Sequence, residues 1–360
     1  MQCLDNMPTQ EIMEKILAAA VNAPSGGNSQ PWHFTFQDGE LAVIAEPEKD
    51  HPILNYRHRG TWIAHGALVE NIKIAAAAHG FKSAVKIFPD ANQPNLTARI
   101  KFESAAPAEE ELFQAMPERT TNRQGYDLKL LTAEQKKYLE PSLREVDGEV
   151  KVIWVEDRNQ INRLGQAAAA NEIVTLENQK LHELFFDEVV WTRQEEVAKK
   201  KGLFVATMEL KPPERFGLKL FKHWPVMRPL TKLGAARKIA ASNAKNYAAT
   251  PLVGLVIVKD RDEDFIGAGR VIERIWLKAA RFGFGFHLIT GTMFFWQGIN
   301  LGGLKIFSED HRRLINDEYQ AVADIAGIKD KNRLVTEMFR IGQGGEPTAR
   351  STKKPPEIQW

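Results

Sequence analysis

Residues 24 to 32 read Pro-Ser-Gly-Gly-Asn-Ser-Gln-Pro-Trp and carry residue types suited to binding a flat or anionic group. Proline cannot continue the Ala-rich helical run that precedes it, and the two glycines let the backbone approach a ligand because they have no Cβ. Hydroxyl and amide side chains can then hydrogen-bond to whatever docks there. The pattern predicts a binding loop that contains Pro24, Ser25, Gly26, Gly27, Asn28 and Gln30; an ordinary turn between a helix and a strand is the alternative.

A second segment, Arg119-Thr120-Thr121-Asn122-Arg123, has the composition of an anion site. Guanidinium groups bind phosphate oxygens in bidentate pairs, and threonine hydroxyls add short hydrogen bonds. We expect a helix to follow directly, and a helix N-terminus also favours anions. The segment therefore predicts phosphate binding, with a solvated basic loop as the alternative.

The helices that must position these segments include an internal repeat. Residues 63–81 and 266–284 align without a gap, so that Gly66 falls on Gly269 and Glu70 on Glu273. Each segment is predicted to be an amphipathic helix that stops at a glycine. Chance similarity between two Ala-rich helices is the alternative to common descent. Because a duplication can place a former symmetric dimer in one chain, we predict repeats at 1–112 and 113–360, with a polar connector at 102–111.

Periodicity predicts the remaining elements. Helices are expected at 9–22, capped by Thr9, and at 132–144 and 159–185; strands are expected at 32–45 (a hairpin), 84–88, 96–103, 150–155, 252–258 and 287–289. This mixture indicates an α+β fold in which helices surround mainly antiparallel sheets. Residues 194–246 are basic and rich in aromatic residues. They are predicted to form a helical insertion, either a lid or a peripheral hairpin.

Composition excludes several classes of function. The chain has 360 residues, 43% hydrophobic and 26% charged, and a net charge of +2, which is too small to predict nucleic acid or a membrane as the partner. The single cysteine, Cys3, fits a reducing compartment, so we expect a cytoplasmic protein. No Cys/His spacing predicts a metal site, and there is no phosphate-loop or nucleophile-elbow motif.

The string at 24–32 resembles the signature loop of the nitroreductase family, which holds flavin mononucleotide (FMN) at a subunit interface. The resemblance implies that Arg119, Thr121 and Arg123 fill the family's Arg-x-Ser-x-Arg/Lys motif, which grips the FMN phosphate, with threonine in place of serine. Residues 339–355 resemble the family's closing segment, which implies that Arg350, Lys353 and Lys354 reach the same phosphate.

A further family element, Pro-x-Glu-Gly, brings backbone N–H groups toward the redox nitrogen of the flavin. Here Gly291 matches its glycine and Thr290 replaces the acid. The contact is expected to survive because a backbone donor does not depend on the side chain.

The two repeats divide the requirements of an FMN site between them. Only the first contains the loop at 24–32, and only the second contains the segment 119–123 and the closing segment. The resemblance therefore implies a nitroreductase-like fold of two tandem repeats, an intramolecular pseudo-dimer of the single-chain, duplicated branch, with one complete site. We expect a monomer of this architecture or a homodimer of it.

The family implies an oxidoreductase that passes hydride from NAD(P)H to FMN and on to a nitroaromatic, quinone or similar flat acceptor. The chemistry belongs to the flavin, so no catalytic side chain is predicted. The alternative is an FMN-binding or FMN-sequestering protein without NAD(P)H-dependent reductase activity, in which residues 194–246 cover the flavin. A scaffold that has lost its cofactor is a third possibility, which the intact loop in the first repeat argues against.

Overall fold

The computed structural model describes residues 7–140 and 149–360. Its first part is a five-stranded sheet in the order β11-β1-β2-β4-β3. Three helices cover one face of this sheet, and side chains such as Met13, Phe34 and Leu68 form the core between the layers. The elements are α1 (Gln10–Ala20), β1 (Trp32–Gln37), β2 (Glu40–Ala45), α2 (Arg59–Ala78), β3 (Phe81–Ile87), β4 (Leu96–Ser104) and α3 (Glu110–Ala115), with β11 (Ile358–Gln359) added from the end of the chain.

The second part is an antiparallel sheet in the order β5-β8-β10-β9 with helices on both faces. Strand β8 is apolar from Leu252 to Val258 because Val256 faces α11 and its neighbour Leu255 faces α5 and α13. The elements are α4 (Ala133–Leu139), β5 (Lys151–Val155), α5 (Arg158–Glu177), β8 (Leu252–Lys259), α11 (Asp262–Arg281), β9 (Gly285–Ile289), α12 (Gly291–Asn300), α13 (Glu309–Ile325) and β10 (Arg333–Gly342).

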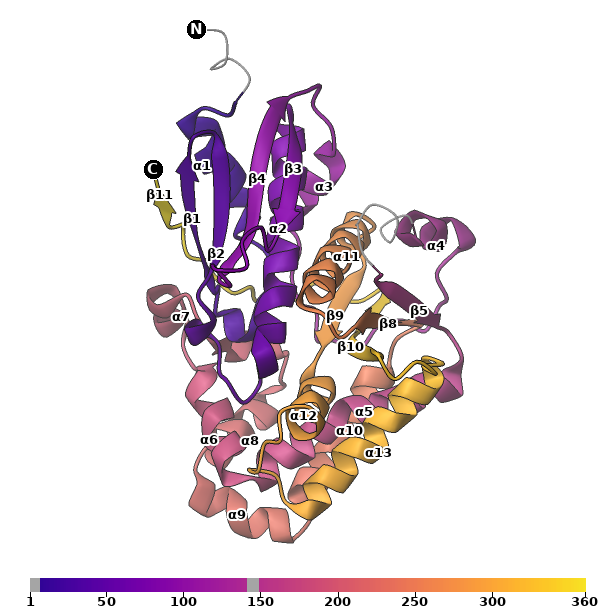
Figure 1. Cartoon of the computed structure of the whole chain (residues 1–360). Helices are drawn as coiled ribbons and strands as arrows, with labels where there is room; N and C mark the ends of the chain where they lie inside the picture. Colours follow the sequence, from indigo (N-terminus) through magenta and orange to yellow (C-terminus); the bar gives the residue numbers. More distant parts are fainter. Residues whose placement is uncertain (1–6, 141–148) are drawn as a thin grey trace, which may run out of the picture.

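Helices α2 and α11 lie side by side between the two sheets (Figure 1). Their contact is reciprocal: a Cβ added to Gly66 would lie 2.0 Å from the carbonyl oxygen of Ile266, and one added to Gly269 would lie 1.9 Å from that of Ile63. These four positions are the ones that the repeat aligns, 63 with 266 and 66 with 269. The glycine of each helix therefore contacts the isoleucine of the other helix, and the two contacts are equivalent. This is the pattern of a two-fold interface. The α+β class and the tandem pseudo-dimer predicted from the sequence are confirmed.

Between α5 and β8 the chain forms a helical layer around α6 (Gln179–Glu188). It comprises β6 (Val189–Val190), α7 (Arg193–Lys199), β7 (Leu203–Phe204), α8 (Pro212–Phe221), α9 (Trp224–Lys232) and α10 (Ala235–Ala248), with β6 and β7 paired in parallel. Helix α10 packs along α5, whereas α8 and α9 pack on α6 and on each other.

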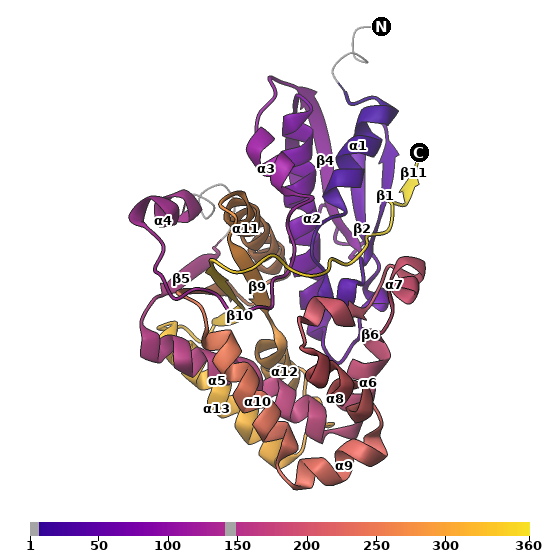
Figure 2. The ribbon, with the colours of Figure 1, turned by 180° about the vertical axis from the view of Figure 1, so that it is seen from behind.

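After β10 the chain crosses back to the first sheet, where β11 pairs in parallel with β1 (Figure 2). The register places Phe34 opposite Ile358. The last segment of the chain is thus part of the first sheet and passes the loop at 24–30 on its way.

Several predicted elements need correction. The single helix at 159–185 is two helices, because Asn178 breaks the first and its side chain caps α6 by accepting from Leu181 N at 3.2 Å. The connector at 102–111 is shorter than predicted, since its start extends β4 and its end begins α3. The helix predicted at 132–144 has its capping box at Thr132. Its residues 141–144 and Cys3 lie outside the described residues. The helix capped by Thr9 and the hairpin at 32–45 are confirmed.

Candidate functional site

Two adjoining cavities, of about 940 and 170 Å³, lie where the two parts of the chain meet. The larger is lined by the loop at 24–29, residues 48–55, the facing sides of α2 and α11, and the end of α6. Both cavities share the lining residues Pro24, Ser25, Gly27, Thr121, Arg123 and Gly202. The two predicted segments, almost a hundred residues apart in sequence, therefore flank one continuous site.

The loop at 24–30 is held by hydrogen bonds that leave its glycines facing the site. Gly27 has a φ of +53°, and its carbonyl oxygen accepts from Gly202 N at 2.7 Å, while nothing lies within 4 Å of a Cβ built on Gly26. Ser25 Oγ accepts from Gln30 N at 3.0 Å. Pro24, Ser25, Gly26 and Gly27 line the larger cavity, and Asn28 lines the smaller.

Gln30 lines neither cavity. Its buried side chain donates to Lys200 O at 2.7 Å, and its Oε1 accepts from Lys354 N at 2.7 Å. It therefore joins the loop to two distant segments behind the lining.

The arginines of the 119–123 segment differ in their surroundings. Arg119 is almost wholly buried, with its Nε 3.3 Å from Glu273 Oε1 and its guanidinium 4.4 Å from the centre of the Trp276 ring. Arg123 donates to Thr207 O at 3.0 Å. Burial lowers the pKa of both arginines. Arg119 thus lines the smaller cavity with a carboxylate beside it, whereas Arg123 lines both cavities with none in contact.

The expected helix N-terminus beside this segment is absent, so that part of the prediction is wrong. Thr121 bridges to Phe286, Asn122 N donates to Phe286 O at 2.8 Å, and the next described helix starts only at Ala133. The extended backbone is fixed by strand β9, so side chains and not a helix dipole give this segment its charge.

The closing segment crosses the smaller cavity. Lys353 Nζ donates to Ala23 O at 2.8 Å and to Asn28 Oδ1 at 2.9 Å, and Arg350 donates to Pro117 O at 2.7 Å. Burial, with the charge of Arg119 adding to it, lowers the pKa of Lys353 to about 7. Arg350 and Lys353 line the smaller cavity and Lys354 the larger.

The Thr290–Gly291 element ends β9 and begins α12. Thr290 lines the larger cavity beside Leu288. Gly291 does not line it and instead packs on α5, where an added Cβ would lie 2.4 Å from the Asn171 side chain. Position 291 must be glycine because of this close packing against α5, independently of any contact that its backbone N–H makes with a ligand.

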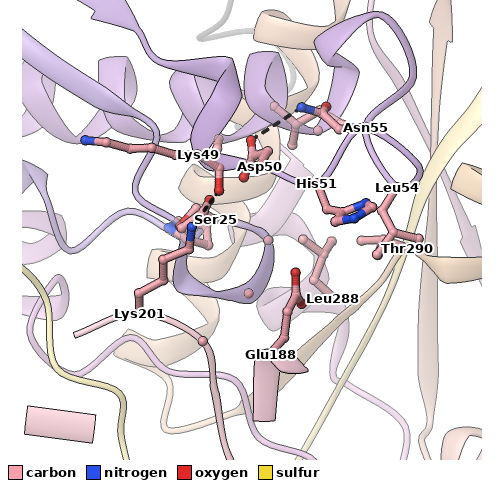
Figure 3. A pocket seen from close by; sticks show the side chains of 18 of the residues that line it. Ser25, Lys49, Asp50, His51, Leu54, Asn55, Glu188, Lys201, Leu288 and Thr290 are labelled. Atoms are coloured by element: carbon pink, nitrogen blue, oxygen red, sulfur yellow. Dashed lines mark hydrogen bonds between the residues drawn. The ribbon is translucent and has the colours of Figure 1, made fainter. Parts of the chain in front are cut away.

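Carboxyl groups in the larger cavity were not predicted from the sequence. Asp50 accepts hydrogen bonds from Thr61 and Asn55, and Glu188 ends α6 across the cavity (Figure 3). Burial raises the pKa of both acids, and the charge of Lys201 acts in the opposite direction on each. No motif marks these acids, because one lies in an irregular segment and the other at a helix end.

Glu337 is the most unusual of these acids. It lies in β10 beside a bulge between Val335 and Glu337, is almost completely buried, and lines the larger cavity. Its Oε2 has no hydrogen-bond partner among the described residues, and burial raises its pKa well above the usual value. Burial thus favours the protonated form of this carboxyl group, and in that form it can donate a hydrogen bond into the cavity. Its signal in the sequence is a single glutamate in the mainly apolar strand 334–341, which also contains Thr336 and Arg340.

Only a short part of the predicted lid touches the site. Within 194–246, the residues that line a cavity are Lys199, Lys201, Gly202, Leu203 and Thr207. Lys201 Nζ donates to Lys49 O at 2.7 Å (Figure 3), and Lys200 O accepts from Asn28 and Gln30. This strap, residues 199–207, runs from the end of α7 through β7 into a 3-10 helix at Val205–Met208 and lines the site, whereas no described residue of α8, α9 or α10 lines either cavity.

Comparison with known proteins relates this chain to one family. Residues 4–53 match the model of the Nitroreductase family. The chain is 27% identical over 288 residues to the uncharacterized protein MT1398 of Mycobacterium tuberculosis, covering 77% of this chain and 38% of that protein. It is 30% identical over 101 residues to "Putative NAD(P)H nitroreductase acg" of the same species, covering 28% of this chain and 30% of that protein. The matches thus span well under half of either relative's length.

Among solved structures, the chain is similar to a nitroreductase with bound FMN from Bacteroides fragilis. The two share 10% sequence identity and a TM-score of 0.35, over 68% of this chain and 94% of that one.

Proposed function

We propose that this chain, which belongs to the nitroreductase family, is an FMN-dependent oxidoreductase that takes hydride from NAD(P)H and reduces a flat acceptor such as a nitroaromatic or a quinone. The observation that carries the proposal is the convergence of the loop at 24–28 and the segment 119–123 on the two adjoining cavities. Flavin binding is the part on which the other steps depend.

The residues present fit FMN. Among the residues that the structure describes, the smaller cavity is lined by four cationic side chains, Arg119, Arg123, Arg350 and Lys353, and by no carboxylate. A phosphate is the group that such a lining favours, because each cation can donate to its oxygens. The larger cavity combines open glycine backbone with apolar side chains such as Leu288 and Trp276, as a flat ring system requires.

When bound, FMN supplies the hydride and electron transfer. In this assignment Arg123, Lys353 and Thr121 hold the phosphate, and Arg119 is oriented toward it by Glu273. Thr290 and the loop at 24–28 line the ring cavity. Glu337 lies at the cavity wall, and its carboxyl group, whose pKa burial raises, can in its protonated form donate to an oxygen or nitrogen of a bound molecule. The strap at 199–207 reduces access of water.

The second candidate is an FMN-sequestering protein, and the strap is the observation that favours it. Its backbone is tied to the loop through Gly202 N and Lys200 O, and Lys201 reaches Lys49 across the cavity. A strap that stays closed would exclude a nicotinamide from the flavin face.

The wider organisation is part of the proposal. We assign residues 1–112 to the first repeat and 113–360 to the second, in a cytoplasmic protein that is a monomer of pseudo-dimer architecture or a homodimer of it. The reciprocal contact of Gly66 and Gly269 supports the pseudo-dimer.

The visible spectrum of the purified protein tests the function. A flavin band that bleaches on anaerobic addition of NADH or NADPH is the expected result. A band that persists under nicotinamide but bleaches with dithionite would favour sequestration. No band after reconstitution with FMN would overturn the cofactor assignment.

A further inference from the structure

Residues 211–238 carry a concentration of positive charge that the chain as a whole does not show. The segment has eight lysines and arginines and a single acid, Glu214, whereas the whole chain has a net charge of only +2. Most of these cationic side chains are solvent-exposed. The eight are Lys211, Arg215, Lys219, Lys222, Arg228, Lys232, Arg237 and Lys238.

Large apolar side chains project from the same segment. Leu233 is 76% exposed and Phe216 73%, the two highest values among the exposed large hydrophobics of the described residues, and Leu220 is 46% exposed. Phe216 and Leu220 are four residues apart on α8 and so share one side of that helix. Lys219 lies beside them, so apolar and cationic groups alternate on the outer surface.

These side chains are not needed to hold the helices in place. Leu218 and Phe221 pack α8 on the core through the cluster of Phe186 and Val190, and His182 Nε2 is 2.8 Å from Phe221 O. The fully buried Met227 anchors α9. These contacts fix both helices on the rest of the molecule. Helix α9 lies at the end of the molecule opposite α1 and β11, with α8 beside it (Figures 1 and 2).

We propose that α8, α9 and the start of α10 form a docking surface for an anionic lipid bilayer. Phe216, Leu220 and Leu233 insert between the headgroups, and the surrounding lysines and arginines contact lipid phosphates. Among the described residues no helix is long and apolar enough to cross a membrane, so the contact is peripheral. The proposal departs from the prediction made from net charge, because an average over the chain conceals a local cluster.

Charge complementarity favours an anionic lipid bilayer over a second copy of the chain as the partner of this surface. A second copy of the chain would bring the same cationic face against itself, which like charges disfavour. A lipid surface offers both a negative headgroup layer and an apolar interior. The binding needs no flavin, so its failure would leave the proposed redox function untouched, and the reverse also holds.

Co-sedimentation with vesicles tests the surface. The full chain should bind vesicles of phosphatidylglycerol and phosphatidylcholine, release from them as salt rises, and not bind phosphatidylcholine alone. Phe216→Ser with Leu233→Ser, and separately Lys219→Glu with Arg228→Glu, should each weaken binding at least about tenfold.

Matched controls lie elsewhere on the surface. Leu128→Ser with Leu130→Ser removes two similarly exposed leucines, and Lys82→Glu with Lys86→Glu reverses two exposed lysines of β3. Both should bind as the parent does, with unchanged circular dichroism for all variants. Equal binding to neutral vesicles, or equal losses in the controls, would overturn the proposal. So would a concentration-dependent dimer that the Phe216→Ser, Leu233→Ser variant abolishes, because it would assign the surface to a second copy.

Discussion

Glu70 and Glu273 occupy equivalent positions on the paired helices α2 and α11 but have different partners. Glu70 pairs with two arginines of α11, Arg270 at 2.9 Å and Arg274 at 2.6 Å. Burial acts to raise the pKa of Glu70, but these two charges outweigh it and the pKa is lowered. Glu273 forms an ion pair with Arg119 at 3.3 Å, and burial raises its pKa. The glutamate of the first repeat is thus paired with two arginines of the second repeat, whereas the glutamate of the second repeat pairs with an arginine that lines a cavity.

Arg119 and Arg123 should differ in what their loss does to stability. Arg119→Ala leaves the buried Glu273 without its cation and should destabilise the protein by about 3–5 kcal/mol. Arg123→Ala should cost much less. Both should lower FMN affinity, and the double variant should retain no FMN. Urea denaturation and flavin fluorescence titration measure the two effects separately.

The matching test adds Glu273→Gln to Arg119→Ala. Stability should largely return, because no unpaired charge remains, but FMN affinity should not. Ordinary FMN occupancy in a folded Arg119→Ala, Arg123→Ala variant would contradict the phosphate assignment.

FMN affinity should fall as pH rises above about 7. Lys353 in the free protein loses its proton near that pH, whereas a bound phosphate would keep the amine charged to higher pH. Binding above pH 7 must then take up a proton, which weakens it progressively. Titration of the apoprotein with FMN between about pH 6.5 and 9, a range that starts near the shifted pKa of Lys353 and stays below the ordinary lysine value, measures this slope.

Lys353→Met serves as the control for that slope. It should bind FMN more weakly at low pH and show little change across the range. If the pH dependence of FMN affinity were the same in Lys353→Met as in the wild type, the proton taken up on binding would belong to another group.

Glu337→Gln should remove a pH dependence of stability. The folded-state pKa of Glu337 lies above its unfolded value, so the folded protein binds more protons, and stability falls as pH rises from about 4.5 upward. The isosteric amide cannot ionise and should show a flatter profile. Thermal melting of both proteins from pH 5 to about 9 gives the comparison, and parallel profiles would show that Glu337 is already ionised in the folded state.

Gly66→Ala and Gly269→Ala should each destabilise the protein by about 2 kcal/mol or more, because each new methyl group would overlap a carbonyl oxygen of the facing helix. Gly217→Ala in α8 is the control. Its nearest neighbour would be at 3.7 Å, so alanine should stabilise that helix by about 0.5–1 kcal/mol. Equal effects at all three glycines would mean that helix propensity, and not close packing, decides them.

The sequence predicted elements whose cause is local. Thr9 and Thr132 cap helices through their own side chains, and the turn at Asp38–Gly39 has the positive φ values that its residue types favour. The break at Asn178 was missed because its second partner, Ile306 O at 2.7 Å, comes from a segment more than a hundred residues away.

The candidate site was predictable in part for the same reason. The loop at 24–28 and the arginines at 119 and 123 carry a local pattern, so they could be named. Asp50, Glu188 and Glu337 could not, since each becomes a cavity residue only through burial by distant elements. Likewise, residue types alone could not show that Gln30 faces away from the cavities or that the lid is only a short strap.

The reciprocal contact of α2 and α11 has a genetic consequence. In a homodimer a single codon specifies both copies of an interface residue, so every substitution is made twice and both sites change together. Here Gly66 and Gly269, like Glu70 and Glu273, are encoded separately. One of two equivalent positions can therefore change while the other keeps its residue, which a homodimer does not allow.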